Sequence, residues 1–305
     1  MAFYVMQRVG QALLAIVAAL LIVFFLVRLS GDPVMLMVTP DATPDQIDAM
    51  RERLGLDGSV IQQFGAFIGH ALQGDLGTSL RTHRPASQMV LERLPATLQL
   101  GLTAFALTMV VAVPVGVYAA AKQGGRFDRF TRLAMAVAQA VPAFWLGAVL
   151  ILIFSVNLGW LPTSGRGGWQ HMVMPVITLS LFSMAGLARL TRSSVLETLR
   201  TEYVKFARVK GASDAKVLWT HAFRNAFLGV LTLAALLLLN TLSGAVIVET
   251  LFSWPGVGEL AISSVSSRDF PVVQAVVLLL AVAYTFGNLL VDIAYGYLNP
   301  QIRLG

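Results

Sequence analysis

The segment VLETLRTEYVKFARVKG (195–211) carries the residue types best suited to binding another molecule. Its apolar residues, at 195, 196, 199, 203 and 206, share one face with charged residues between them, which predicts an amphipathic helix. Gly211 ends this helix, and Ser213 or Asp214 can cap a second helix that follows at once. The predicted chemistry is non-covalent, because a basic amphipathic helix can lie on anionic lipid or dock on a protein. The pattern alone does not separate these two partners.

Motifs for catalysis or for metal binding are missing from the sequence. The chain has no cysteine, no Gly-rich loop ending in Gly-Lys-Ser/Thr, no His-Glu-x-x-His and no Gly-x-Ser-x-Gly. His70 has no partner at ligand spacing, so we expect it to be a surface or packing residue. The Gly-Val-Gly at 256–258 follows Trp-Pro in a turn, without the strand that a phosphate-binding loop requires. We therefore expect no catalytic residue, no metal and no cofactor.

The charged residues leave six long gaps in the sequence, and these gaps predict the architecture. Apolar residues make up 56% of the 305 residues and charged residues only 12%, which excludes a water-soluble enzyme and a disordered chain. A helix needs about 20 apolar residues to cross a hydrocarbon layer of about 30 Å. We therefore predict an all-α integral membrane protein with six transmembrane helices. The intervals without Asp, Glu, Lys or Arg are 9–27, 94–121, 133–165, 167–188, 225–248 and 270–291.

The basic residues predict which loops face the cytoplasm. The loop at 122–132 and the stretch 189–224 together contain twelve Lys and Arg residues, whereas the short loops on the opposite side contain only Arg166 and Arg268. Cytoplasmic loops of membrane proteins carry the excess of Lys and Arg. Both termini are therefore predicted to be cytoplasmic. We attribute the formal net charge of +6 to this orientation and expect no nucleic-acid partner.

The segment that follows the first span is predicted to be a small folded insert outside the membrane. Thr43 can cap a helix that starts at Pro44 and ends at Gly55, with Gln46 at capping-box spacing. A second helix is predicted over 60–73. We expect the first span to stay in the mature chain as an anchor, because its apolar run exceeds that of a signal peptide and no clear Ala-x-Ala site follows it.

Four amide side chains in or near the predicted spans are candidates for lining a solute pathway, since intramembrane polar groups usually face protein or water. The alternative is that each one only hydrogen-bonds a neighbouring helix, which contributes about 0.6 kcal/mol on average. Pro142 is expected to kink the third span. Glu249, at the outer end of the fifth span, is expected to be solvated at the interface or held in a salt bridge. The four candidates are Gln99, Gln139, Asn240 and Asn288.

The stretch from Tyr203 to Ala226 resembles the cytoplasmic loop of ABC-importer permeases. Ala207 and Gly211 match the general pattern of Glu-Ala-Ala, three residues, then Gly. The peptide/nickel branch typically reads Tyr-Val-x-x-Ala-Arg-x-Lys-Gly and then His-Ala-x-Arg-Asn-Ala, and the same residues stand here from Tyr203 onward and from His221 onward. Further stretches similar to the B-type permease of this branch are LGL (54–56), GDLGTS (74–79), ERLPATL (92–98), WLPTSG (160–165), FSWPGVGEL (252–260), RDFPVVQA (268–275) and LNPQIR (298–303).

The resemblance implies a type I ABC-importer permease fold in a bacterial inner membrane. Its parts would be a transmembrane helix at 1–29, an extracytoplasmic insert at 30–95 and a five-helix core at 96–305 with a coupling loop at 195–226. Such a permease pairs with a second homologous permease. Two cytoplasmic ATPase subunits power the pair, and an extracytoplasmic solute-binding protein delivers the solute. The residues implied in coupling to the ATPase are Tyr203, Phe206, Ala207, Arg208, Lys210 and Gly211.

The sequence leaves the solute open. By family frequency a dipeptide or oligopeptide is the first choice, and glutathione, a nickel chelate or haem are the alternatives. A stand-alone ion-coupled secondary transporter is the rival class. Such transporters usually contain an internal repeat and buried ionisable groups along an ion route. The sequence shows neither a duplication of six spans nor a carboxylate at mid-membrane depth.

Overall fold

The computed structural model describes residues 2–29, 34, 43–53 and 58–298, and these residues are helical apart from turns and one isolated β-bridge between Thr78 and Pro85. The chain forms two compact units. The first consists of Met1–Pro95 and Gly256–Leu289, and the second of Ala96–Pro255 and Leu290–Gly305. Helix α5 (Ala86–Ala121) runs from the first unit into the second without a break.

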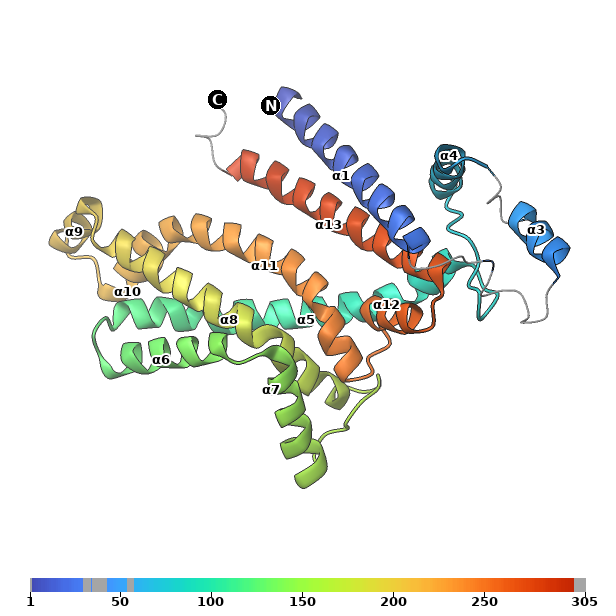
Figure 1. Cartoon of the computed structure of the whole chain (residues 1–305). Helices are drawn as coiled ribbons and strands as arrows, with labels where there is room; N and C mark the ends of the chain where they lie inside the picture. Colours follow the sequence, from blue (N-terminus) through green and yellow to red (C-terminus); the bar gives the residue numbers. More distant parts are fainter. Residues whose placement is uncertain (1, 30–33, 35–42, 54–57, 299–305) are drawn as a thin grey trace. The chain divides into compact units, whose positions relative to one another are not determined.

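The first unit contains the predicted insert. Helix α4 packs on α1 through the rings of Phe64 and Phe67, which surround the buried ring of Phe24. Ser59 caps α4, and Gln62 completes a capping box with it. A separate core joins the start of α5 to α12 and α13. The helices of this unit, drawn in Figure 1, are α1 (Ala2–Leu29), α3 (Pro44–Arg53), α4 (Val60–Leu72), α12 (Val257–Ser266) and α13 (Phe270–Leu298) as far as Leu289.

The second unit is a bundle in which α8 packs against α6, α7 and α11. Its cores are built mainly from Ala, Val, Leu and Met. Gly116 lets α5 approach α8 closely, because a Cβ at this position would lie 2.6 Å from the carbonyl oxygen of Ala188. The helices are α6 (Arg126–Ala140), α7 (Ala143–Leu150, then π-helical over Ile151–Asn157), α8 (Gln170–Leu199), α9 (Glu202–Val209), α10 (Asp214–Lys216, then π-helical over Val217–Phe223) and α11 (Arg224–Leu251).

Five helices in the described part of the chain are long and apolar enough to cross a membrane. The predicted third span, 133–165, differs from the prediction of one kinked helix: α6 and α7 meet at an angle of 99°. Val141 has an extended backbone (φ −83°, ψ 120°), because the ring of the following Pro142 disfavours a helical conformation there. The described helices therefore amount to six spans only if the bent pair counts as one.

The predictions of three shorter helices have mixed outcomes. The predicted helix over 60–73 is confirmed as α4, and α3 begins at Pro44 as predicted, with the backbone N–H of Thr43 donating to Gln46. Its predicted end at Gly55 lies outside the described residues. The amphipathic helix predicted from residue 195 is wrong as one helix, because α8 ends at Leu199 and a new helix starts after Thr201.

Candidate functional site

Residues 202–223 form a sharp elbow, in which α9 turns into α10 at Gly211. Gly211 has φ +82°, a backbone conformation that favours glycine. Its N–H donates to the carbonyl of Arg208 (2.9 Å), and the N–H of Ala212 donates to the carbonyl of Ala207 (3.2 Å). These two bonds form a Schellman motif, which satisfies the carbonyls of Ala207 and Arg208 at the end of α9. Ser213 then caps α10 by accepting from the N–H of Lys216.

The elbow is fixed to its own unit by buried side chains, among them Val217 and Ala222 of its second half, and by one hydroxyl. Val204 of α9 is fully buried. The hydroxyl of Tyr203 donates to the carbonyl of His221 (3.0 Å) and accepts from the side chain of Asn225, so it ties α9 to the helical segment that leads into α11. Because both ends are held, the elbow can move with α8 and α11 as a rigid body.

The outer face of α9 is apolar, open and flanked by cations. The side chains of Tyr203, Phe206 and Val209 are 44%, 59% and 83% exposed and border a shallow hollow of about 480 Å³. The ammonium of Lys210 lies 4.7 Å from the ring centroid of Phe206. Arg208 is exposed beside them, and Ala207 is half-buried. The six predicted coupling residues thus lie within one short helix and its terminal turn.

Val209 is the residue on this face that the sequence analysis missed. It continues the three-residue spacing of Tyr203 and Phe206, and that spacing was the available signal. The prediction stopped at the second aromatic residue.

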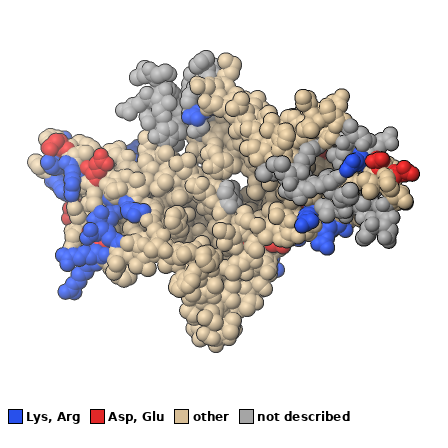
Figure 2. Space-filling view, in the orientation of Figure 1, with Lys and Arg blue, Asp and Glu red and all other residues tan. Residues whose placement is uncertain are grey.

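Basic side chains, with acidic ones among them, gather on the second unit at the left of Figure 2, where α9, α10 and the start of α6 lie. One buried carboxylate, that of Asp128 in the first turn of α6, pairs with basic side chains of this part. Asp128 accepts from Arg192 of α8 (2.5 and 3.0 Å) and from the backbone N–H of Gly124 (2.9 Å). A buried charge left without its partner costs about 3–5 kcal/mol, so this pair holds α6 to α8.

The side-chain oxygen and nitrogen of Gln99 each contact a partner. Its oxygen accepts from Nε and Nη2 of Arg166 (3.2 and 2.7 Å), and its nitrogen lies 3.3 Å from the sulfur of Met172. Arg166 also lies over the ring of Trp254, 5.8 Å from its centroid. The indole of Trp254 is buried and donates to the carbonyl of Ala96 (2.9 Å). Gln99 therefore belongs to a network of side chains from one unit.

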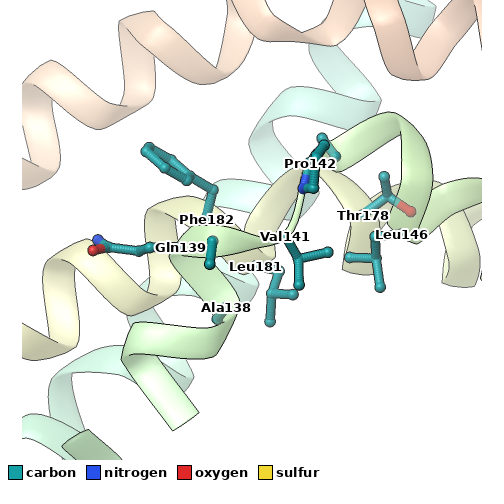
Figure 3. A pocket seen from close by; sticks show the side chains of 10 residues that line it. Ala138, Gln139, Val141, Pro142, Leu146, Thr178, Leu181 and Phe182 are labelled. Atoms are coloured by element: carbon teal, nitrogen blue, oxygen red, sulfur yellow. The ribbon is translucent and has the colours of Figure 1, made fainter. Parts of the chain in front are cut away.

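Gln139 lies beside the bend between α6 and α7. Its side chain accepts a hydrogen bond from Arg189. It lines an open pocket of about 310 Å³ together with Pro142, Thr178 and Phe182 (Figure 3). Apart from Gln139 and Thr178 the lining residues are apolar, so the pocket is mainly hydrophobic.

The other two predicted pathway residues lie apart from these. Asn240 is exposed on α11, and Asn288 is half-buried on α13 in the first unit. Among the hydrogen bonds of the described residues, none joins two of the four amide side chains. Their grouping into a pathway stays a prediction.

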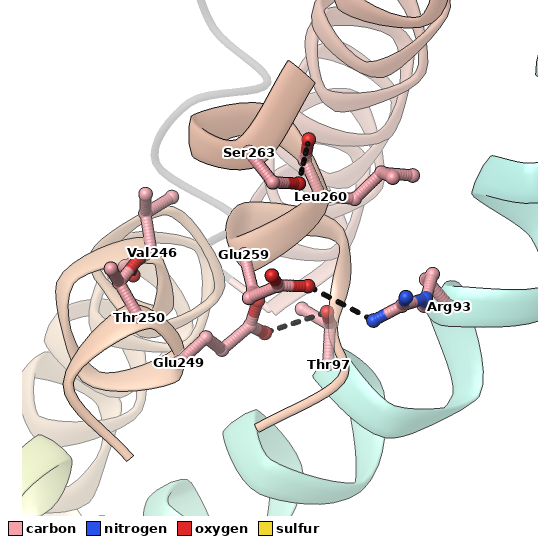
Figure 4. Close-up of polar contacts among 8 residues, drawn as sticks. All are labelled: Arg93, Thr97, Val246, Glu249, Thr250, Glu259, Leu260 and Ser263. Carbon is pink, nitrogen blue, oxygen red and sulfur yellow. Dashed lines mark hydrogen bonds and ion pairs between the residues drawn. The ribbon is translucent and has the colours of Figure 1, made fainter. Parts of the chain in front are cut away.

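Glu249 is a correction to the sequence analysis. An interfacial position in water was one expectation, but the side chain is fully buried. Its carboxylate accepts a hydrogen bond from the hydroxyl of Thr97 (2.7 Å), which Figure 4 shows between α11 and α5. In the first unit, Glu259 pairs with Arg93 at 3.0 Å, and both side chains are partly exposed.

Comparisons with known proteins cover nearly the whole chain. Residues 112–304 match the family model of the "binding-protein-dependent transport system inner membrane component", and residues 1–101 match the model of its N-terminal part. The chain is 39% identical, over 98% of both chains, to a glutathione transport system permease protein of Salmonella paratyphi A. It is 37% identical, over 98% of both chains, to a putative peptide transport system permease protein of Brucella abortus.

Solved structures share the fold at low sequence identity. One is an inward-facing form of the MetNI methionine ABC transporter, with a TM-score of 0.60 and 16% identity, covering 70% of this chain and 97% of that chain. Another is an amino acid ABC transporter with histidines, with a TM-score of 0.55 and 17% identity, covering 68% and 94%.

Proposed function

Because the chain belongs to the family of binding-protein-dependent transport system inner membrane components, we propose that it carries a small peptide, or a peptide-like solute such as glutathione, into the cytoplasm. The chain is a multi-pass inner-membrane permease subunit of an ABC importer. The observation that carries the proposed solute class is the identity of 39% and 37%, over nearly the full length, with permeases of the glutathione and peptide transport systems.

ATP is hydrolysed on partner subunits in this proposal. Two cytoplasmic ATPases drive this permease and a second, homologous permease, and an extracytoplasmic binding protein supplies the solute. The pathway opens between the two permeases, so a single chain does not complete it. The family name supports dependence on a binding protein, and the number and identity of the other subunits belong to the proposal.

The elbow at 202–223 is the coupling element. Phe206 and Val209 enter a cleft of an ATPase subunit, and Arg208 and Lys210 meet acidic groups at its rim. The exposure of this apolar face supports the assignment, since a short helix with exposed aromatic anchors is the kind of surface that dominates interface energy. Nucleotide-driven closure of the ATPases then moves the elbow with α8 and α11, as a rigid body.

Six spans with both termini in the cytoplasm follow if α6 and α7 together make one span. The contact between Ser79 and Asp269 supports this topology, because both residues lie in segments that the distribution of basic residues assigns to the outer side. A reporter enzyme fused after Gly305 is expected to show a cytoplasmic position. One inserted after Gly74 is expected to show a position outside the cytoplasm. An exported C-terminal reporter would overturn the six-span topology in favour of five spans.

Transport itself is tested with the complete complex in sealed vesicles. Labelled dipeptide or glutathione is expected to accumulate only when ATP and the binding protein are both present. Inactivating the ATPases should stop uptake, and collapsing the proton gradient should not. Uptake by this chain alone, driven by a proton gradient, would instead establish the ion-coupled secondary transporter.

A further inference from the structure

The first unit carries a basic hollow that none of the steps above uses. It is lined by Leu80, Arg81, Ser266, Ser267 and Arg268 and has a volume of about 480 Å³. Two turns build it: one follows the bridge residue Thr78, and the other joins α12 to α13. Both arginines are exposed, and the serines add hydroxyl groups between them.

Asp269 holds together the two turns that form the basic hollow. This carboxylate is buried, accepts from the hydroxyl of Ser79 (2.5 Å) and accepts from the backbone N–H of Leu80 (3.1 Å). The same hydroxyl of Ser79 accepts from the N–H groups of Arg81 and Thr82 (3.2 and 3.0 Å). The backbone that carries each guanidinium is thus fixed before any ligand arrives, which lowers the entropic cost of binding.

The two guanidinium groups have no ion-pair partner within the described part of the chain, although neighbouring arginines do. Arg84 pairs with Glu92 at 2.6 Å, and Arg93 pairs with Glu259 at 3.0 Å. Asp269 is the nearest acidic residue in sequence to Arg268, but its carboxylate accepts hydrogen bonds from Ser79 and Leu80. Arg81 and Arg268 therefore present free N–H donors whose geometry suits a carboxylate.

We propose that the basic hollow is a docking socket for an acidic side chain, Asp or Glu, on the surface of the solute-binding protein. This inference rests on the proposed function, because it requires a binding protein and an outward-facing first unit. A protein surface is favoured over the solute as the source of the carboxylate. Solute sites are mostly apolar with a few polar groups, whereas this hollow is mainly polar and open, as charged rims of protein interfaces are.

The test measures binding of the solute-binding protein that purifies with the native complex. The assembled transporter, carrying Arg81→Glu and Arg268→Glu together, is placed in lipid nanodiscs and titrated with that protein. We expect affinity to fall at least about tenfold, mainly through a slower association rate, because two attractive charges become repulsive. The wild-type affinity is expected to decrease as salt is raised, and the salt dependence of the variant should be much weaker.

Two matched variants separate charge from folding. The double substitution Arg81→Lys with Arg268→Lys keeps both charges and should retain most of the affinity. Arg84→Gln removes a charge from the same turn that is already paired with Glu92, and should leave affinity unchanged. Each variant must retain its ATPase subunits, which reports that the complex is intact.

The outcomes distinguish the socket from the proposed function. If the ATPase activity of the wild-type complex does not respond to the binding protein, the proposed function itself is contradicted. A responsive wild type with unchanged affinity in the Glu double variant would overturn the socket alone. Unchanged affinity for the binding protein, combined with a selective loss of transport for solutes with a free carboxylate, would overturn protein docking and assign the hollow to the solute.

Discussion

Replacing Gly211 with proline is expected to abolish ATP-driven uptake while the chain still inserts into the membrane. The backbone at Gly211 has φ +82°, whereas proline is fixed near −65°. The substitution also removes the N–H that donates to Arg208. The Schellman turn cannot form in this variant, so α9 loses its orientation relative to α10, and the face with Phe206 and Val209 no longer meets the ATPase. Uptake into vesicles and the amount of chain in the membrane are the two measurements.

Gly74→Pro is the matched control. Gly74 follows the end of α4 with φ +80°, its N–H donates to the carbonyl of Ala71, and a Cβ there would meet no atom within 4 Å, as at Gly211. The two substitutions therefore impose a similar backbone penalty in different units. Uptake should survive the substitution at Gly74. Full uptake by the Gly211 variant would contradict the elbow as a coupling device, and equal loss in both would assign the effect to general destabilisation.

Phe206→Asp is expected to release the ATPase subunits from the complex. The ring of Phe206 is exposed and lies under the ammonium of Lys210, so the substitution removes the central apolar anchor of α9 and places a carboxylate against the partner. Loss of such an anchor costs at least about 2 kcal/mol, or roughly a thirtyfold weaker association. Co-purification of the ATPases with the tagged permease measures the change.

Ile61→Asp controls for the removal of an exposed apolar side chain. Ile61 is 84% exposed on α4, in the predicted insert, and its replacement should leave the ATPases bound. Retention of the ATPases by the Phe206 variant, at wild-type affinity, would remove α9 from the docking surface and favour the reading in which the amphipathic segment lies on lipid.

The sequence predicted the helices best where local pattern and length decide the structure. Charge-free intervals located α1, α5, α8, α11 and α13. The positive φ of Gly211 and the cap at Ser213 were also predictable, since each depends on one residue type at one position. The helix predicted over 60–73 is present as α4.

Features that depend on backbone angles at a break, or on distant contacts, were not predictable. Pro142 indicated a kink, but its presence did not predict the 99° angle between α6 and α7. The break before α9 was hidden, because the apolar spacing continues across it. There the hydroxyl of Thr201 donates to the carbonyl of Thr198 (2.6 Å), and the backbone of Thr201 turns extended. Glu249 is buried and bonded to Thr97, 152 residues away, and no local pattern reveals such a contact.

The bond between Ser79 and Asp269 also constrains the order in which the chain folds during its synthesis. The two residues are 190 positions apart, and a ribosome adding about 5–20 residues per second needs roughly 10–40 s to reach the second after the first. During that time the turn at 79–85 lacks the carboxylate that organises it. The turn at 79–85 therefore gains these two hydrogen bonds only after the chain has been synthesised past Asp269, which places the closing of this turn late in co-translational folding.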